Sequence, residues 1–394
     1  IILNLLGGFT MPQPATHYLV TRFSIPKQYY NLWDKYKSYF GLGSSLPDLF
    51  YFPTVSIVAD GSIVDALKNK IQYHDINWTE MADMIHADKS YDLFCRMLDY
   101  AKAIQSAEPE NTDKYLKLFA VAFGFYNHVV ADCIFHPYVY RSTGDFWNTT
   151  DFIDELQHKK QEAYIDGKIY ECFYSGEDAY QRMKINCREN DTSALDFDVA
   201  EMLKTTLSEI YPDMRDSLST DITDPEHPLH HAYMALENTT NFLFEERTTV
   251  CLWGQKKSED ISFSDLIGEF SDEFFTENYP DCENLPAQSP YKLFLLSVTV
   301  GYKVFNEAMN YINAPEISAK QYFSLHNTHY LRSGNFNLDT GLSALNNNDP
   351  DLTCGKECSY SFKEDTLSNN YRYFESDFKE HQSILESKGL LNLI

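Results

Sequence analysis

Residues 112–136 read TDKYLKLFAVAFGFYNHVVADCIFH and form the most hydrophobic segment of this 394-residue chain. A helix that is hydrophobic on all sides is buried, because it has no polar face to present to water. The segment therefore predicts a central helix over 116–136 that other helices surround.

Helical spacing of apolar residues recurs along most of the chain and predicts further helices. In the segment 90–104, for example, apolar residues form one stripe after Ser90, which we expect to be the helix N-cap. The alternation of apolar and polar residues that marks strands is nearly absent. We therefore expect an all-α fold, a multi-helix bundle. The other predicted helices cover residues 25–40, 193–211, 228–246 and 289–312.

The amino-acid composition of the sequence changes near Pro315. Residues 326–360 are rich in Asn, Gly, Ser and Asp, which favours irregular structure. We expect residues 11–315 to form one helical domain and 316–394 to form an irregular C-terminal extension that packs on it, with one short helix at 373–387. Residues 1–10 are interpreted as an added or upstream segment.

The central helix carries three polar residues at a spacing of four. His128, Asp132 and His136 would share one helix face, so two imidazoles and a carboxylate point into one volume. A single histidine on an apolar face is more often a core residue with satisfied nitrogens. However, His158 and Glu162 repeat the spacing shortly afterwards. Buried charges need an opposite charge or a metal ion, so the two sets together favour a metal site.

Three residues nearer the N-terminus add candidates. His17 follows Thr16, a predicted helix N-cap. Asp48 lies in a loop directly after a proline, and His86 lies at the end of one short predicted helix and before another. Each residue taken alone is better explained as a surface, turn or capping residue. Their order along the chain is more specific than any one of them.

That order resembles the zinc-dependent phospholipase C family. The series is His17, the PD of Asp48, the HAD of His86, the H-x-x-x-D of His128, a further histidine and the H-x-x-x-E of His158. The resemblance covers about residues 11–165 and extends more loosely to about 245. It implies a helical bundle of the zinc-dependent phospholipase C type, similar in fold to single-strand-specific fungal nucleases. The implied activity is phosphodiester hydrolysis by a metal-activated water that attacks phosphorus.

The resemblance also implies how the ligands are divided among metal positions. One position takes Asp48, His86, His128 and Asp132; a second takes His136, His158 and Glu162; a third takes His17 and the shared Asp132. In secreted members an N-terminal Trp completes the third position, and no Trp begins this chain. We therefore expect two Zn²⁺ ions, with the third position incomplete.

A second departure from the family pattern concerns the central helix. The gap between Asp132 and His136 is shorter than in the secreted enzymes, and Pro137 follows directly. Because the residue before a proline disfavours helical backbone, we expect the helix to end at His136.

The ligand types indicate the chemistry of the predicted site. Imidazoles and carboxylates without thiolates suit Zn²⁺ and also tolerate Mn²⁺ or Fe²⁺. Two such ions would lower the pKa of a shared water and hold the oxygens of a phosphoryl group. Asp48 is the candidate general base that orients the attacking hydroxide. Glu162 is the second candidate catalytic residue, and it closes the second site.

The formal net charge of −26 limits the partners. Such a surface repels nucleic acid, whose binding depends on Lys and Arg, and it disfavours anionic lipid. Small phosphoesters or zwitterionic phospholipid head groups remain as expected substrates. No apolar run approaches the roughly 18 to 20 residues that cross a bilayer, so we expect no stable membrane insertion.

Cysteine usage bears on the compartment. Cys95 and Cys133 lie in apolar helical stretches, which suits reduced thiols in a core. The pair Cys354 and Cys358 has no further ligands clustered near it, so we do not expect it to bind a metal. We expect a cytoplasmic protein; secretion is the alternative if residues 1–10 are the remnant of a signal peptide.

Two other functions stay open on the sequence alone. An HD-type or nucleotide phosphohydrolase is suggested by the dipeptide His74–Asp75, although that dipeptide precedes a loop rather than lying on a core helix. A non-catalytic helical protein stabilised by metal would carry the same ligands without turnover. Metal analysis together with a panel of phosphodiester substrates separates these alternatives.

Overall fold

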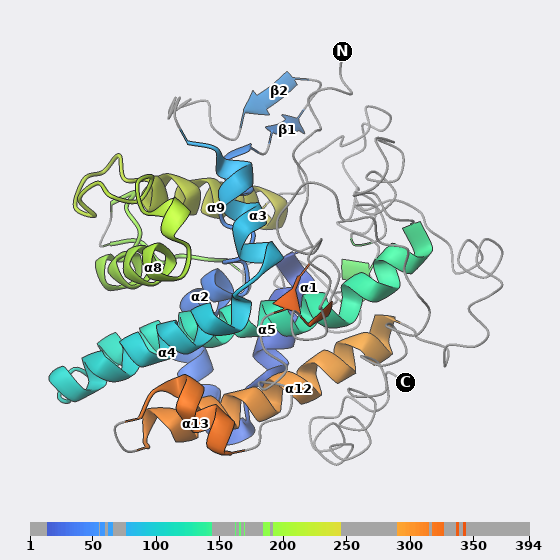
Figure 1. The fold of residues 1–394 in the computed structure, drawn as a ribbon. Coiled ribbons are helices and arrows are strands. Elements are labelled where there is room, and N and C mark those ends of the chain that lie inside the picture. Colours follow the sequence, from blue (N-terminus) through green and yellow to red (C-terminus); the bar gives the residue numbers. More distant parts are fainter. Residues whose placement is uncertain are drawn as a thin grey trace.

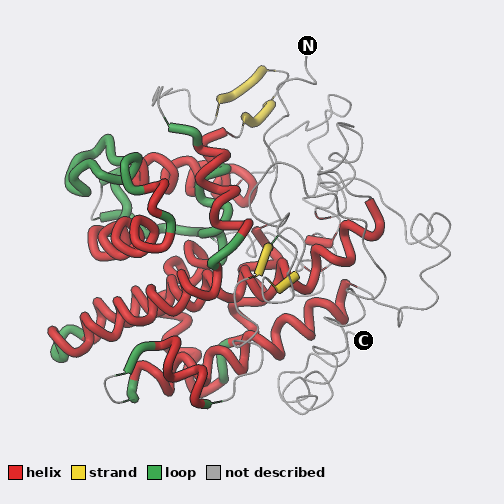
Figure 2. The backbone as a smooth tube through the Cα atoms, in the orientation of Figure 1, coloured by secondary structure: helices red, strands yellow, loops and turns green. Residues whose placement is uncertain are grey.

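The protein is a bundle of helices around one long central helix, as the sequence predicted (Figures 1 and 2). The computed structural model describes residues 14–54, 56–59, 62–65, 76–143, 162, 165–166, 169, 184–189, 192–245, 290–314, 317–326, 336–338 and 342–343. The α-helices of this part are α1 Pro14–Ser24, α2 Tyr30–Gly43, α3 Trp78–Ala87, α4 Ser90–Ala107, α5 Thr112–Thr143, α8 Phe197–Ile210, α9 Pro228–Glu245, α12 Pro290–Ile312 and α13 Ala319–Leu325. Short 3₁₀ helices are η2 Lys27–Tyr29, η3 Phe52–Thr54 and η4 Pro212–Met214.

Strands are a minor component of the described residues. The strands β1 Ser56–Ala59 and β2 Ser62–Asp65 form one antiparallel hairpin, and β3 Phe336–Asn337 and β4 Leu342–Ser343 form another. The first hairpin lies apart from the helices in Figure 1, whereas β3 contacts α3, α4 and α5. The all-α assignment is therefore confirmed.

Helix α5 is the element on which the others pack. It contacts α1, α2, α4, α8 and α12, and in Figure 1 it crosses the middle of the bundle. Its stretch Thr112–His136 has the length and hydropathy of a membrane-crossing helix, a longer apolar run than we expected from the sequence. The hydrophobic window of that stretch is entirely buried inside the protein, which is how the core helix of a bundle satisfies an all-round apolar surface.

The expected end of the central helix at His136 is wrong. Helix α5 continues through Pro137 to Thr143. A proline within a helix removes one backbone hydrogen bond but does not stop the helix where packing fixes both neighbouring turns. Here His136 and Val139, on either side of the proline, are both buried.

Two glycines allow α2 and α5 to touch through their backbones. A Cβ added at Gly43 would lie 2.2 Å from the carbonyl oxygen of Val121, and one added at Gly124 would lie 2.3 Å from that of Phe40. Real Cβ atoms essentially never approach so closely. The crossing therefore requires glycine on both helices, and it fixes where the chain leaves α2 at Ser44.

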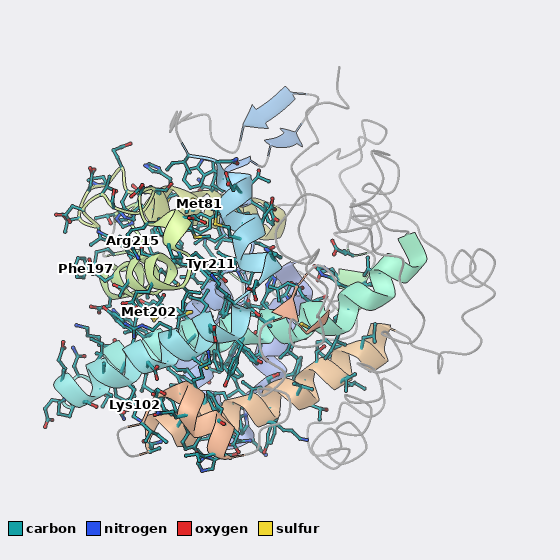
Figure 3. All side chains as sticks on the ribbon, in the orientation of Figure 1. Met81, Lys102, Phe197, Met202, Tyr211 and Arg215 are labelled. Carbon is teal, nitrogen blue, oxygen red and sulfur yellow. The ribbon has the colours of Figure 1, made fainter. Side chains whose placement is uncertain are left out.

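The corner between α3 and α4 differs from the expected Ser90 N-cap. The N-cap is Lys89, which has a left-handed backbone (φ 62°), and Ser90 is the first residue of the helix. Tyr211, labelled in Figure 3, donates its hydroxyl hydrogen bond to the Asp88 carbonyl at 2.8 Å. The end of α3, where His86 lies, is thereby tied to the end of α8.

The described part of the C-terminal extension contains regular structure as well as the hairpin. Helix α13 begins with a capping box between Ser318 and Gln321. It contacts α4 and α12 near Lys102, whose ammonium group donates to the Tyr311 carbonyl at 3.1 Å (Figure 3). The helix predicted at 373–387 lies outside the described residues.

The cysteines of the described region are buried and unpaired, as the sequence predicted for Cys95 and Cys133; Cys187 shares this state. Burial raises the pKa of the Cys133 thiol well above its usual value, with a further rise from nearby Asp132. These thiols are therefore protonated core groups and not metal ligands. The pair Cys354 and Cys358 lies outside the described residues.

The glycine crossing gives the first testable prediction. Gly124→Ala should lower the free energy of unfolding by about 1–3 kcal/mol, because the new methyl group meets backbone that cannot yield. Gly41→Ala is the matched control, since its Cβ would meet only side-chain atoms of Ile185 and Tyr18, at 3.3 Å. Denaturant unfolding of both variants measures the difference. Equal stability of the two variants would show that the crossing tolerates a side chain.

Candidate metal centre

The structure brings seven of the eight predicted ligands into one buried region beside α5. None of the seven is more than 6% exposed. They come from α1, the loop after α2, α3, α5 and residue 162; they are His17, Asp48, His86, His128, Asp132, His136 and Glu162. The eighth, His158, lies outside the described residues.

One group of ligands forms between the loop after α2, α3 and α5. Asp48 lies in a series of tight turns and reaches His86 Nε2 with Oδ1 at 3.1 Å and His128 Nε2 with Oδ2 at 3.8 Å. The three ligand atoms lie within 4.8 Å of one another. This spacing is compatible with one cation held by all three residues.

A second group shares His128. Asp132 places Oδ2 at 2.9 Å from His128 Nε2 and Oδ1 at 3.3 Å from His17 Nε2. The rings of His17 and His128 stack in parallel, with centroids 3.8 Å apart and an interplanar angle of 8°. Asp132 therefore lies between two imidazoles and can serve ions on both sides, which is the shared role that the family resemblance implied.

His136 and Glu162 form the third contact, with His136 Nε2 at 3.0 Å from Glu162 Oε1. They line a pocket together with His17 and Asp132. The remaining walls are Thr16, Phe135, Val139 and Ile165. The pocket therefore has a polar base of four possible metal ligands under mainly apolar walls.

Backbone carbonyls fix the orientation of the imidazoles on α3 and α5. His86 donates from Nδ1 to the Ala82 carbonyl at 2.9 Å, and His128 donates from Nδ1 to the Ser44 carbonyl at 2.8 Å. A carbonyl oxygen only accepts, so Nδ1 must carry the proton. In a neutral ring Nε2 then has a lone pair, and both Nε2 atoms face Asp48. Metal-binding histidines are held by this type of contact.

The lone pairs on these nitrogens are close to carboxylate oxygens, which are also acceptors, and a cation between them would remove this unfavourable arrangement. His128 Nε2, Asp48 Oδ1, His17 Nδ1 and both Asp132 oxygens are buried without a hydrogen-bond partner. Acceptors that face one another in a dry interior cost free energy unless a proton or a metal ion lies between them. A set of imidazole and carboxylate ligands at these separations fits Zn²⁺.

The pKa shifts within the cluster also favour a bound cation. Burial lowers the pKa of His128, but Asp132 and Asp48 more than offset this effect, so its pKa is raised. Burial opposes ionisation of Asp132 as well, yet His128, His136 and His17 hold its pKa well below the usual range. Asp132 is therefore the permanent anion of the centre and attracts positive charge to it.

Asp48 and His17 are shifted toward their neutral forms. Burial raises the pKa of Asp48, although His128 and His86 oppose the rise. Burial lowers the pKa of His17 well below its usual value, and His128 lowers it further. A neutral His17 imidazole keeps a lone pair available for a cation.

Sequence reasoning missed Asp166, which holds the helix that carries His17. Its carboxylate accepts hydrogen bonds from the backbone N–H of Ala15, at 3.2 Å, and of Thr16. The helix begins at Pro14 and is capped by this distant residue, so the expected N-cap at Thr16 is wrong. Burial raises the pKa of Asp166 to about 7, although these donors lower it. The signal in the sequence was its position four residues after Glu162.

Among the described residues, three further histidines lie outside the groups that could hold a metal ion. His227, His230 and His231 are buried near the start of α9. His230 accepts from the Leu195 N–H with Nδ1 and donates to the Ile222 carbonyl from Nε2, so both nitrogens are satisfied. The dipeptide at 74–75 that suggested an HD-type enzyme lies outside the described residues.

Comparison with known proteins agrees with this geometry. Residues 16–213 match the family model for zinc dependent phospholipase C. The match covers about half of the chain and includes all eight predicted ligands. No curated protein and no solved structure matches significantly. The chain therefore belongs to the zinc-dependent phospholipase C family.

Proposed function

We propose that this protein is a zinc-dependent phosphodiesterase of the phospholipase C type that hydrolyses a small phosphodiester or a phospholipid head group. The observation that carries the proposal is the buried set of imidazole and carboxylate atoms that face one another without hydrogen-bond partners. Family membership supports the reaction class, a hydrolase that acts on phosphoric ester bonds.

The contacts support an assignment of ligands to two zinc positions. In this proposal the first is held by Asp48, His86, His128 and Asp132, and the second by His136, Glu162 and the shared Asp132. His158 joins the second position on the family resemblance alone. His17 lines the same pocket as His136 and Glu162 and contacts Asp132 at 3.3 Å. We therefore assign His17 to the side of Asp132 that faces the second position, where it strengthens that position instead of creating a separate third one.

The chain's own residues supply positioning, proton transfer and exclusion of water. Bound zinc supplies a water of lowered pKa and polarises the phosphoryl oxygens. Asp48 lies against both His86 and His128, and burial raises its pKa. In this proposal a carboxylate oxygen of Asp48 accepts a proton from the attacking water, which is the general-base role. Phe135, Val139 and Ile165 form the apolar wall that limits water in the pocket.

Charge supports a phosphodiester as the ligand. Three buried carboxylates, Asp48, Asp132 and Glu162, face the proposed ions. Two divalent zinc ions against three carboxylates leave a net charge of +1, which attracts a singly charged phosphodiester. The formal net charge of the whole chain is −26, which repels polyanions such as nucleic acid and favours a substrate with a cationic head.

The activity is tested with zinc, a chelator and a matched pair of variants. Zinc-loaded protein should hydrolyse a choline-lipid analogue, and chelation should abolish turnover. Asp132→Asn should lose bound zinc and essentially all activity, because it removes the anion shared by both positions. Asp34→Asn, the same change on the exposed face of α2, is the control and should be unaffected.

Two results would contradict this proposal. Full activity of the Asp132 variant would show that the cluster is structural, as in the non-catalytic alternative. Hydrolysis of nucleotides but not of a head-group ester would favour the nucleotide phosphohydrolase alternative. Assaying both substrates with the same zinc-loaded preparation separates these outcomes.

Asp48→Asn separates the two roles of Asp48. Asparagine keeps an oxygen for the cation but cannot accept the proton, so turnover should fall by about 10²–10⁴-fold. Zinc content, measured by metal analysis, should fall much less than in the Asp132 variant. Parallel loss of zinc and turnover would show that Asp48 acts only as a ligand.

A further inference from the structure

A residue of the C-terminal extension lies directly behind the metal centre. Leu338 follows strand β3, which contacts α3, α4 and α5, and its side chain is fully buried. Its backbone N–H donates to the His86 carbonyl at 2.7 Å. Its carbonyl accepts a hydrogen bond from His136 Nδ1. The backbone of this one residue therefore links α3 and α5, the helices that carry His86 and His136.

The contact sets the chemistry of His136. Because the Leu338 carbonyl can only accept, Nδ1 of His136 carries a proton, and in a neutral ring Nε2 then keeps the lone pair. Nε2 faces Glu162 Oε1 at 3.0 Å, on the side of the pocket. The tautomer and the ring direction required of a metal ligand are thus imposed by the backbone of residue 338.

For His86 and His128, the carbonyl that accepts the Nδ1 hydrogen bond comes from other parts of the chain. His86 uses a carbonyl of its own helix, and His128 uses the carbonyl of Ser44 at the end of α2. Both acceptors lie inside the region 16–213 that matches the family model. The acceptor for His136 lies far beyond residue 213, so the part of the chain that defines the family does not supply it.

We propose that Leu338 is a positioning residue of the metal centre, which makes the C-terminal extension part of the second zinc position. This inference rests on the proposed function. The buried side chain of Leu338 anchors the backbone at this position, and that backbone forms the hydrogen bonds to His136 and to the His86 carbonyl at the end of α3. Loss of such an outer contact typically weakens metal binding by about 10–100-fold.

The test compares two identical substitutions in the extension. Leu338→Asp puts a charge where the side chain is fully buried, whereas Leu325→Asp changes a residue that is 74% exposed at the end of α13. Zinc affinity is measured by competition with a chelator on protein shown to be folded by circular dichroism. We expect one zinc ion of Leu338→Asp to bind about 10–100-fold more weakly and Leu325→Asp to match the wild type.

Two measurements keep the proposal falsifiable if Leu338→Asp does not fold. Leu338→Ala keeps the backbone but removes most of the buried anchor, and it should weaken the same zinc ion by a smaller factor. Nitrogen-15 NMR of labelled histidines in the zinc-loaded wild type should show His136 with its proton on Nδ1. A His136 that binds zinc through Nδ1 would overturn the proposal without any variant.

The outcomes distinguish this inference from the proposed function. Folded Leu338 variants that keep wild-type affinity for both ions would overturn the positioning role and leave the phosphodiesterase proposal intact. A lower melting temperature of the metal-free protein with unchanged zinc affinity would show a purely structural role and would also overturn it. Wild-type protein that binds no zinc would instead overturn the proposed function itself.

Discussion

The interaction on which the rest of the structure depends is the meeting of imidazole lone pairs and carboxylates inside a dry core. His128 is the clearest case, because it is fully buried, donates from Nδ1 to a carbonyl and points Nε2 at Asp132 from 2.9 Å. Without a positive charge between them, these acceptors would oppose folding. In the proposed function the helices around α5 therefore surround metal ions as well as forming a hydrophobic core, and metal binding would stabilise the fold.

The positions of the ligand side chains are well defined because backbone contacts fix the segments that carry them. Gly43 and Gly124 let α2 and α5 approach closely enough for the Ser44 carbonyl to reach His128. Asp166 holds the first turn of the helix that carries His17. The backbone of Leu338 bonds to His86 on α3 and to His136 on α5. Groups held in this way keep their direction in the absence of a ligand, which is the preorganisation that metal catalysis requires.

The spacing of residues along the sequence was sufficient to predict the features of the site that depend on helical periodicity. The four-residue spacing of His128, Asp132 and His136 placed them on one face of a buried helix, and the structure has them so. The convergence of Asp48 and His86 on that face came from motif order and the family resemblance, since nothing local links a loop and a helix end to α5.

The remaining features depend on contacts between distant residues. Asp166 acts through a helix start about 150 positions away, and Leu338 reaches His136 across about 200. No spacing rule encodes such pairs. The helix through Pro137 was missed for a related reason, because tertiary packing on both sides of the proline outweighed its local preference.

The central claim, that a cation resolves the conflict at His128, is tested most directly by diffraction at the zinc absorption edge from crystals of zinc-loaded protein. The account predicts an anomalous peak at about 2.0–2.1 Å from His128 Nε2, the usual zinc–nitrogen distance, in contact with the carboxylate of Asp48 or Asp132. A second peak is expected between His136 and Glu162. The absence of a peak beside His128, with its Nε2 hydrogen-bonded directly to Asp132, would contradict the account.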